Sequence, residues 1–180
     1  MEIASLDKLL ESELKDIYSA EGQLLKALPK MAKAASNKVL KQAFTRHVDE
    51  TKAQVQRLDK IGEMLGIKLK GKKCKAMEGL LEEGKELLEA EGPPAILDAA
   101  MIGAAQRVEH YEISAYGTAR TLAEHMGNAQ VAKLLQQTLD EESATDEKLT
   151  AISMKEILPQ TDMEVEEEDE APTPRKKARR

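Results

Sequence analysis

Apolar residues recur every three or four positions along four long stretches of this chain, which is the spacing of an amphipathic α-helix. We therefore expect helices over about residues 5–35, 37–66, 94–126 and 128–158. Suitable N-caps stand at Ser5, Asn37 and Asn128, and suitable helix ends at Gly66 and Gly127. Pro29 should kink or loosen the end of the first helix, and Pro159 should stop the last one.

The segment between the second and third helices breaks this pattern. Residues 67–92 begin with a basic loop, continue as a short helix over residues 76–91, and end at a Gly-Pro-Pro sequence. A connector of this length lets the helices on either side of it run parallel. The pattern thus predicts an all-α four-helix bundle with a long crossover that carries a short extra helix.

The two halves of the chain repeat each other. A shift that places Glu21 on Glu112 also places Glu50 on Glu141 within similar local sequences. Both Glu21 and Glu112 have apolar residues four positions before and three positions after them, so they should point into the core. Because buried carboxylates are costly without compensation, four of them in two-fold arrangement suggest a cation held between the helices.

Other possible ligands lie one helical turn from these glutamates. His47 precedes Glu50 by three positions, and Glu109 precedes Glu112 by three. The full set of candidate metal ligands is Glu21, His47, Glu50, Glu109, Glu112, Glu141, Glu142 and Asp146, with Tyr18 as a candidate hydrogen-bond partner of the site. Two simpler readings stay open: single glutamates on a solvated helix face, and a core-margin His47 bonded to a carboxylate.

Composition narrows the class of protein. Charged residues make up 33% of the chain and aromatic residues 2%, which favours helices with an aliphatic core. The net charge of −6 argues against a protein body that coats nucleic acid. A single cysteine, no signal peptide and no apolar run long enough for a bilayer predict a cytoplasmic protein.

The end of the chain differs from the rest. Residues 164–170 are almost all acidic and residues 175–180 almost all basic, with Pro172 and Pro174 between them. With so few apolar residues, this segment cannot offset the entropy of ordering. We expect a bundle domain over residues 1–159 and a disordered tail over residues 160–180, whose basic end offers at most weak contact with nucleic acid.

Four segments in order resemble the YciE/YciF-like family of the ferritin-like superfamily. They are residues 13–21 (ELKDIYSAE), 73–80 (KCKAMEGL), 108–117 (VEHYEISAYG) and 139–149 (LDEESATDEKL). The resemblance implies a bacterial, cytoplasmic ferritin-like bundle that is often dimeric and linked to stress responses. It further implies a site for two iron ions, with O₂ or peroxide as oxidant in a ferroxidase-type reaction. A homodimer would also cover the connector-helix residues Met77, Leu80, Leu81, Leu87 and Leu88, which we expect to be exposed.

The chain departs from the common ferritin-like ligand pattern, which has Glu-x-x-His on the second and fourth helices. Ala53 follows Glu50 and Ala144 follows Glu141 at the histidine positions, and Thr138 matches His47. The site should therefore be rich in oxygen ligands, which leaves manganese, zinc or magnesium open as alternatives to iron. Two other functions also stay open: a non-enzymatic stress-response bundle with a vestigial site, and a peroxide-disproportionating protein like the manganese catalases.

Overall fold

The computed structural model of the protein describes residues 3–161, which fold into helices. These are α1 (Leu6–Ala34), α2 (Lys38–Leu65), α3 (Lys75–Leu88), α4 (Pro94–His125) and α5 (Ala129–Ile152), followed by the π-helical turn η1 (Ser153–Ile157). The acidic and basic blocks of the predicted tail lie outside the described residues.

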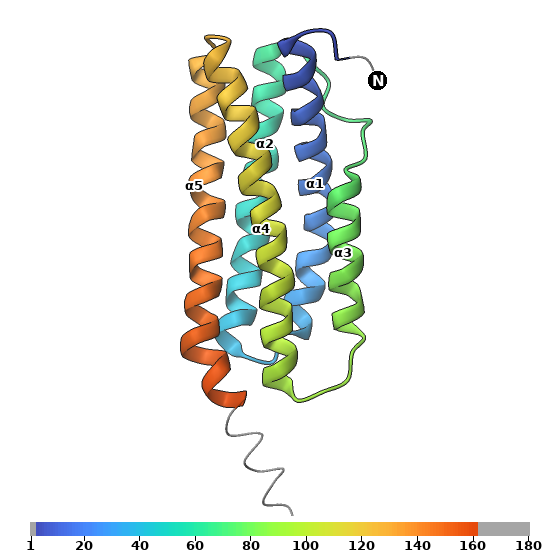
Figure 1. The fold of residues 1–180 in the computed structure, drawn as a ribbon, viewed down its shortest axis with the longest axis vertical. Coiled ribbons are helices and arrows are strands. Elements are labelled where there is room, and N and C mark those ends of the chain that lie inside the picture. The colour runs from blue at the N-terminus through green and yellow to red at the C-terminus, as the bar shows by residue number, and fades with distance from the viewer. Residues whose placement is uncertain (1–2, 162–180) are drawn as a thin grey trace, which may run out of the picture.

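Four of the helices form the predicted bundle, and α3 lies outside it (Figure 1). α1 packs on α2 and α4, and α5 packs on α4 and α2, so that α2 and α4 are diagonal to each other. The crossover carries the chain back along the bundle, and α2 and α4 therefore run in the same direction, as predicted (Figure 1). No helix in residues 3–161 is long and apolar enough to cross a membrane.

Local signals set most of the helix ends. The Ser5 hydroxyl accepts a hydrogen bond from Lys8 N at 3.2 Å, and Asn37 Oδ1 accepts one from Val39 N at 2.8 Å. Gly66 (φ 66°) and Gly127 (φ 76°) have the left-handed conformation that ends a helix and that glycine adopts without strain. The predicted cap at Asn128 differs, because its side chain makes no capping hydrogen bond.

The predicted stop at Pro159 is wrong, because the chain is still helical at residue 161, the last residue that the structure describes. The reason lies in the wider turn that precedes the proline, where Leu158 N bonds to Ser153 O, five residues back. Ile157 at the end of this turn is fully buried, and Gln160 Nε2 donates to Glu156 O at 2.6 Å. Packing and this side-chain bond therefore hold the helix beyond the residue that cannot donate a backbone hydrogen bond.

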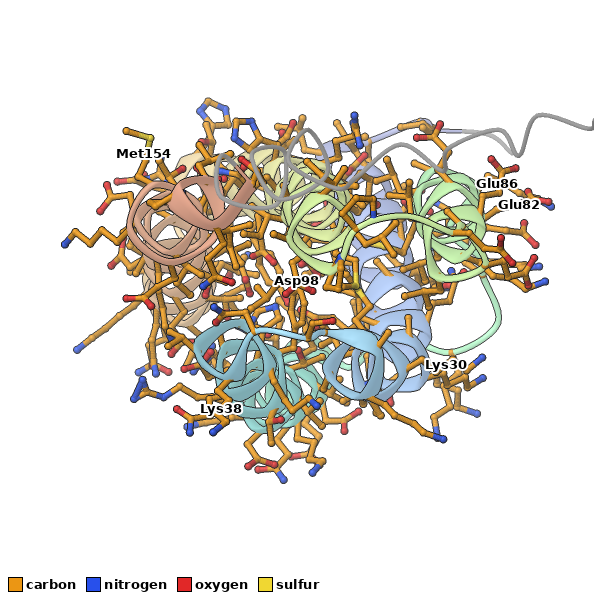
Figure 2. All side chains as sticks on the ribbon, turned by 90° about the horizontal axis from the view of Figure 1, so that it is seen from below. Lys30, Lys38, Glu82, Glu86, Asp98 and Met154 are labelled. Carbon is orange, nitrogen blue, oxygen red and sulfur yellow. The ribbon has the colours of Figure 1, made fainter. Side chains whose placement is uncertain are left out.

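The expected exposure of the connector helix is also wrong. Met77 is fully buried, and Leu80, Leu81 and Leu88 pack against the core cluster formed by α1, α2, α4 and α5. α3 contacts both α1 and α4, so its apolar stripe is already covered within one chain. Glu82 and Glu86 point outward from it in the end-on view (Figure 2).

Polar residues divide the bundle core into two apolar clusters. The lower cluster, near the α1–α2 turn, includes Leu24, Phe44 and Leu149. The upper cluster includes Ile17 and Leu58. Since Ile17 and Leu24 lie one turn before and after Glu21 on α1, the glutamate stands at the boundary between the two clusters.

Asp98 holds the α1–α2 turn to α4 at the lower end of the bundle (Figure 2). It is buried, and its Oδ1 and Oδ2 accept hydrogen bonds from Ser36 N (2.9 Å) and Asn37 N (2.6 Å). We expect Asp98→Ala to lower the free energy of unfolding by roughly 2–4 kcal/mol, because two backbone donors lose a charged acceptor. Urea denaturation would measure this loss.

Asp98→Asn, which keeps one acceptor oxygen, should recover about half of that loss. Asp49→Ala is the surface control, because the Asp49 side chain is 76% exposed. Equal stability of Asp98→Ala and Asp49→Ala would contradict the anchoring role of Asp98.

Candidate metal centre

Acidic side chains and one imidazole meet in the layer between the two apolar clusters. His47 on α2, Glu109 and Glu112 on α4, and Glu142 on α5 are all buried, and one ligand atom of each lies within 4.8 Å of the others. His47 Nε2 is 3.4 Å from Glu109 Oε1 and 3.9 Å from Glu142 Oε2. This group can hold a metal ion, because imidazole and carboxylate are the usual ligands of iron, manganese and zinc.

Glu21 belongs to the same layer. It comes from α1 and is fully buried, and its charge acts on both Glu109 and Glu112. The hydroxyl of Tyr116 donates a hydrogen bond to Glu21 Oε1, while Oε2 has no partner. All four bundle helices therefore contribute an acid or an imidazole to the layer.

Many atoms of this layer lack hydrogen-bond partners among residues 3–161. They are Glu21 Oε2, His47 Nε2, Gln54 Oε1, Glu109 Oε2, both Glu112 carboxylate oxygens and Glu142 Oε2. Buried polar atoms are nearly always hydrogen-bonded, and each one left without a partner is destabilising. A cation at this position would satisfy most of them at once, so the residues present fit a metal centre.

Neighbouring residues fix the orientation of the candidate ligands. His47 Nδ1 lies 3.4 Å from Glu50 Oε2, which leaves Nε2 facing the cluster. The side-chain amide of Gln54 donates to Glu142 Oε1. Such outer contacts set the tautomer and direction of ligating groups.

The remaining candidates from the sequence lie at the margin of the layer or outside it. The Glu50 side chain is 39% exposed, and the Glu141 side chain is 33% exposed and bonded to Arg57 at 2.9 Å. Asp146 faces away, accepting from Gln106 Nε2 at 3.0 Å and lying 3.4 Å from His110 Nε2. Tyr18 interacts with Asp59, and Tyr116 rather than Tyr18 bonds to Glu21.

The sequence repeat fixes only part of the cluster. Glu21 and Glu112 are equivalent in the two halves and both are buried. The shift that relates them places Tyr18 on Glu109 and Thr51 on Glu142, so these two ligand positions are acidic in only one half. The sequence did not identify Tyr116 as a site residue. Its position one turn after Glu112, on the apolar stripe of the helix, could have indicated that its hydroxyl lies near the buried carboxylates.

Burial and mutual repulsion shift the acid–base equilibria of the layer. Burial, reinforced by Glu142, raises the pKa of Glu21 to about 8, and burial raises the pKa of Glu109 to about 8. The pKa of Glu112 and that of Glu142 are also raised, first by burial and then by neighbouring carboxylates. Burial alone would lower the pKa of His47, but the Glu50 hydrogen bond and the Glu142 charge raise it.

We expect the metal-free protein to lose stability as the pH rises from about 5 to about 8. The pKa of Glu21 and of Glu109 is about 8 in the folded state against an ordinary 4.5, so the folded protein binds more protons in this window. Each such carboxyl group then contributes a slope of about 1.4 kcal/mol per pH unit. Urea titrations at several pH values in chelator would measure it.

Glu112→Gln provides the check on this pH dependence. It keeps the shape of the side chain and removes the charge, so it should be more stable than the wild type at pH 8 and show a shallower slope. Glu83→Gln, on the exposed side of α3, should behave like the wild type. A flat pH profile for the wild type would mean that these carboxyl groups are solvated.

Comparisons of the sequence and of the fold with known proteins point to the same family. Residues 5–161 match the family described as a domain of unknown function, DUF892. The chain is 48% identical over 158 residues to the protein YciF of Escherichia coli K12, covering 87% of this chain and 95% of YciF. The crystal structure of the E. coli stress protein YciF has a TM-score of 0.82 to this fold, covering 84% of this chain and 96% of that one. YcfI from Rhodopseudomonas palustris is 42% identical with a TM-score of 0.80, covering 83% and 95% of the two chains. The chain therefore belongs to the YciE/YciF-like family, as its sequence segments indicated.

Proposed function

We propose that the buried layer binds two iron ions and that the protein oxidises Fe²⁺ with O₂ or peroxide as part of a stress response. The observation that carries this proposal is the set of unpartnered buried oxygens and the His47 Nε2 that face one another. Four buried carboxyl groups that share a single imidazole would be strongly destabilising when ionised, and cations would remove that cost. The stress protein YciF of E. coli, at 48% identity, supports the physiological part of the proposal.

His47, Glu109, Glu112 and Glu142 are the proposed inner ligands. Glu21 completes the set from α1, held by the Tyr116 hydroxyl, and Glu50 is placed at the solvent side of His47. Glu141 and Asp146 are left outside the proposed ligand set, because each is engaged by residues away from the cluster. Two ions rather than one match the number of buried carboxylates, as in other carboxylate-bridged bundles.

The bound iron would supply one-electron transfer to oxygen species. The residues of the chain would hold the ions and release protons as the ions bind. The carboxyl groups with raised pKa lose their protons when a cation binds, so metal uptake should release protons to solvent. The apolar clusters above and below the layer limit the access of water to it.

Manganese is the second candidate metal, and one observation favours it. The cluster within 4.8 Å contains one imidazole and three carboxylates, and oxygen-rich sites suit Mn²⁺. In that case the protein would disproportionate peroxide instead of oxidising iron. Cytoplasmic location and a homodimer belong to the same proposal and rest on the family resemblance.

Metal binding should raise the melting temperature. Fe²⁺ under anaerobic conditions, or Mn²⁺, at about 100 times its dissociation constant would stabilise the folded state by about 2.7 kcal/mol, or roughly 5–10 °C. His47→Ala and Glu112→Ala should each abolish this gain, although they lie in different halves of the repeat. Differential scanning calorimetry with and without metal would measure it.

Glu147→Ala, an exposed position on the same helix as Glu142, is the matched control and should keep the full gain. Because removing a buried charge can stabilise the metal-free protein, the relevant quantity is the metal-induced shift of each variant. If neither Fe²⁺ nor Mn²⁺ shifts the melting temperature, the metal proposal fails and an interaction bundle with a vestigial site replaces it.

Iron oxidation should depend on the same residues. Aerobic addition of Fe²⁺ should give ferric absorbance severalfold faster with the wild type than in buffer, and Glu142→Ala should return the rate to that of buffer. Wild-type Fe²⁺ oxidation no faster than buffer, together with metal-induced stabilisation by Mn²⁺, would select the peroxide-disproportionating alternative.

A further inference from the structure

The repeat places a carboxylate and a cation at two equivalent positions along the α2–α5 contact. The shift that relates the two halves pairs Glu50 with Glu141 and also Arg57 with Lys148. Both carboxylates lie at the margin of the buried layer, on the face where α2 meets α5. The two positions therefore share a carboxylate and a cation, but the cation is an arginine at one and a lysine at the other.

The position at Arg57 is closed. The Arg57 guanidinium bonds to both Glu141 oxygens, at 2.9 and 3.0 Å, and to the Thr138 hydroxyl. Its side chain is only 10% exposed, and Gln54 reaches Glu141 at 3.3 Å from the inner side. A planar guanidinium held by this many bonds fills the space between the two helices.

The position at Lys148 is open by comparison. Among the described residues Glu50 pairs with Arg46 at 3.7 Å and with His47, and it forms no ion pair with Lys148. A cavity extends inward from Glu50, Thr145 and Lys148 into the lower half of the bundle. Equivalent positions in the two halves thus differ: Arg57 and Glu141 close one, while Glu50 and Lys148 line a cavity at the other.

The cavity is apolar except at the metal layer and at its mouth. Its inner wall is formed by aliphatic and aromatic side chains that include Leu24, Leu28, Phe44, Val108 and Leu149. His47 and Glu109 close its upper end, and His47 Nε2 and Glu109 Oε2 have no hydrogen-bond partner among residues 3–161. A molecule in this cavity would therefore lie directly beside two proposed metal ligands.

Size and polarity together limit the occupant. The cavity has a volume of about 20 Å³, which is enough for one or two water-sized positions. Peroxide and water need several hydrogen-bond partners, which this cavity offers only at its two ends and not along its aliphatic and aromatic wall. A small apolar diatomic molecule is therefore the occupant that suits the middle of the cavity.

We propose that this cavity is a dioxygen-binding site that opens between Glu50 and Lys148 and ends at His47 and Glu109. Its use in catalysis rests on the function proposed above, and it selects O₂ over peroxide as the oxidant. The site itself is a property of the folded chain, so it can be tested on the metal-free protein.

Dissolved O₂ is the probe, because it is paramagnetic and speeds the relaxation of nearby methyl protons. In the metal-free full-length chain under O₂ pressure, methyl groups of Leu28 and Leu149 should relax severalfold faster than those of Leu58 and Leu135. All four leucines are at most 3% exposed, but only the first two line the cavity. Equal enhancement at the four leucines would overturn the proposal, whatever the protein does with metals.

Filling the cavity gives a second test with the same measurement. Ala105 lines it, so Ala105→Leu should remove the excess relaxation at Leu28 and Leu149. Ala27→Leu, in the surface groove between α1 and α3, is the matched control and should keep it. Retention of the excess in Ala105→Leu would also overturn the proposal, and should that variant fail to fold, the leucine comparison in the wild type still decides.

Discussion

The removal of water from five ionisable side chains at mid-height of the bundle is the constraint on which the rest of this structure depends. Carboxyl groups in such a place are stable only when protonated or bound to a cation. Tyr116, Gln54 and Glu50 each engage one atom of the layer, and its inward atoms have no hydrogen-bond partner among residues 3–161. Folding and acid–base behaviour are therefore coupled through the same few oxygens, and the proposed metal uptake would be coupled to both.

The repeat explains why equivalent glutamates of the two halves lie in this layer. The other acidic and imidazole side chains of the layer stand at positions where the two halves differ. Two equivalent helix pairs place Glu21 and Glu112 across from each other. His47, Glu109 and Glu142 have Thr138, Tyr18 and Thr51 as their counterparts, which makes the centre chemically one-sided. Such asymmetry gives the two halves of the layer different ligands and different access to solvent.

The sequence predicted what depends on local patterns and missed what depends on contacts between helices. Periodicity and caps predicted the bundle helices, and apolar neighbours predicted that Glu21 and Glu112 point inward. Adjacent residues point in different directions on a helix, so the choice between Glu141 and Glu142 needed Arg57, which comes from another helix. The burial of Met77 likewise depends on how α3 packs against α1 and α4, which a sequence pattern does not show.

The crossover helix acts as a wall as well as a connection. α3 covers the flank where α1 meets α4, while the opening at Glu50 and Lys148 lies where α2 meets α5. These are opposite sides of the bundle (Figure 1). Small molecules that use the proposed cavity would therefore reach the layer from the flank opposite α3, and a partner protein seated on that flank would block them.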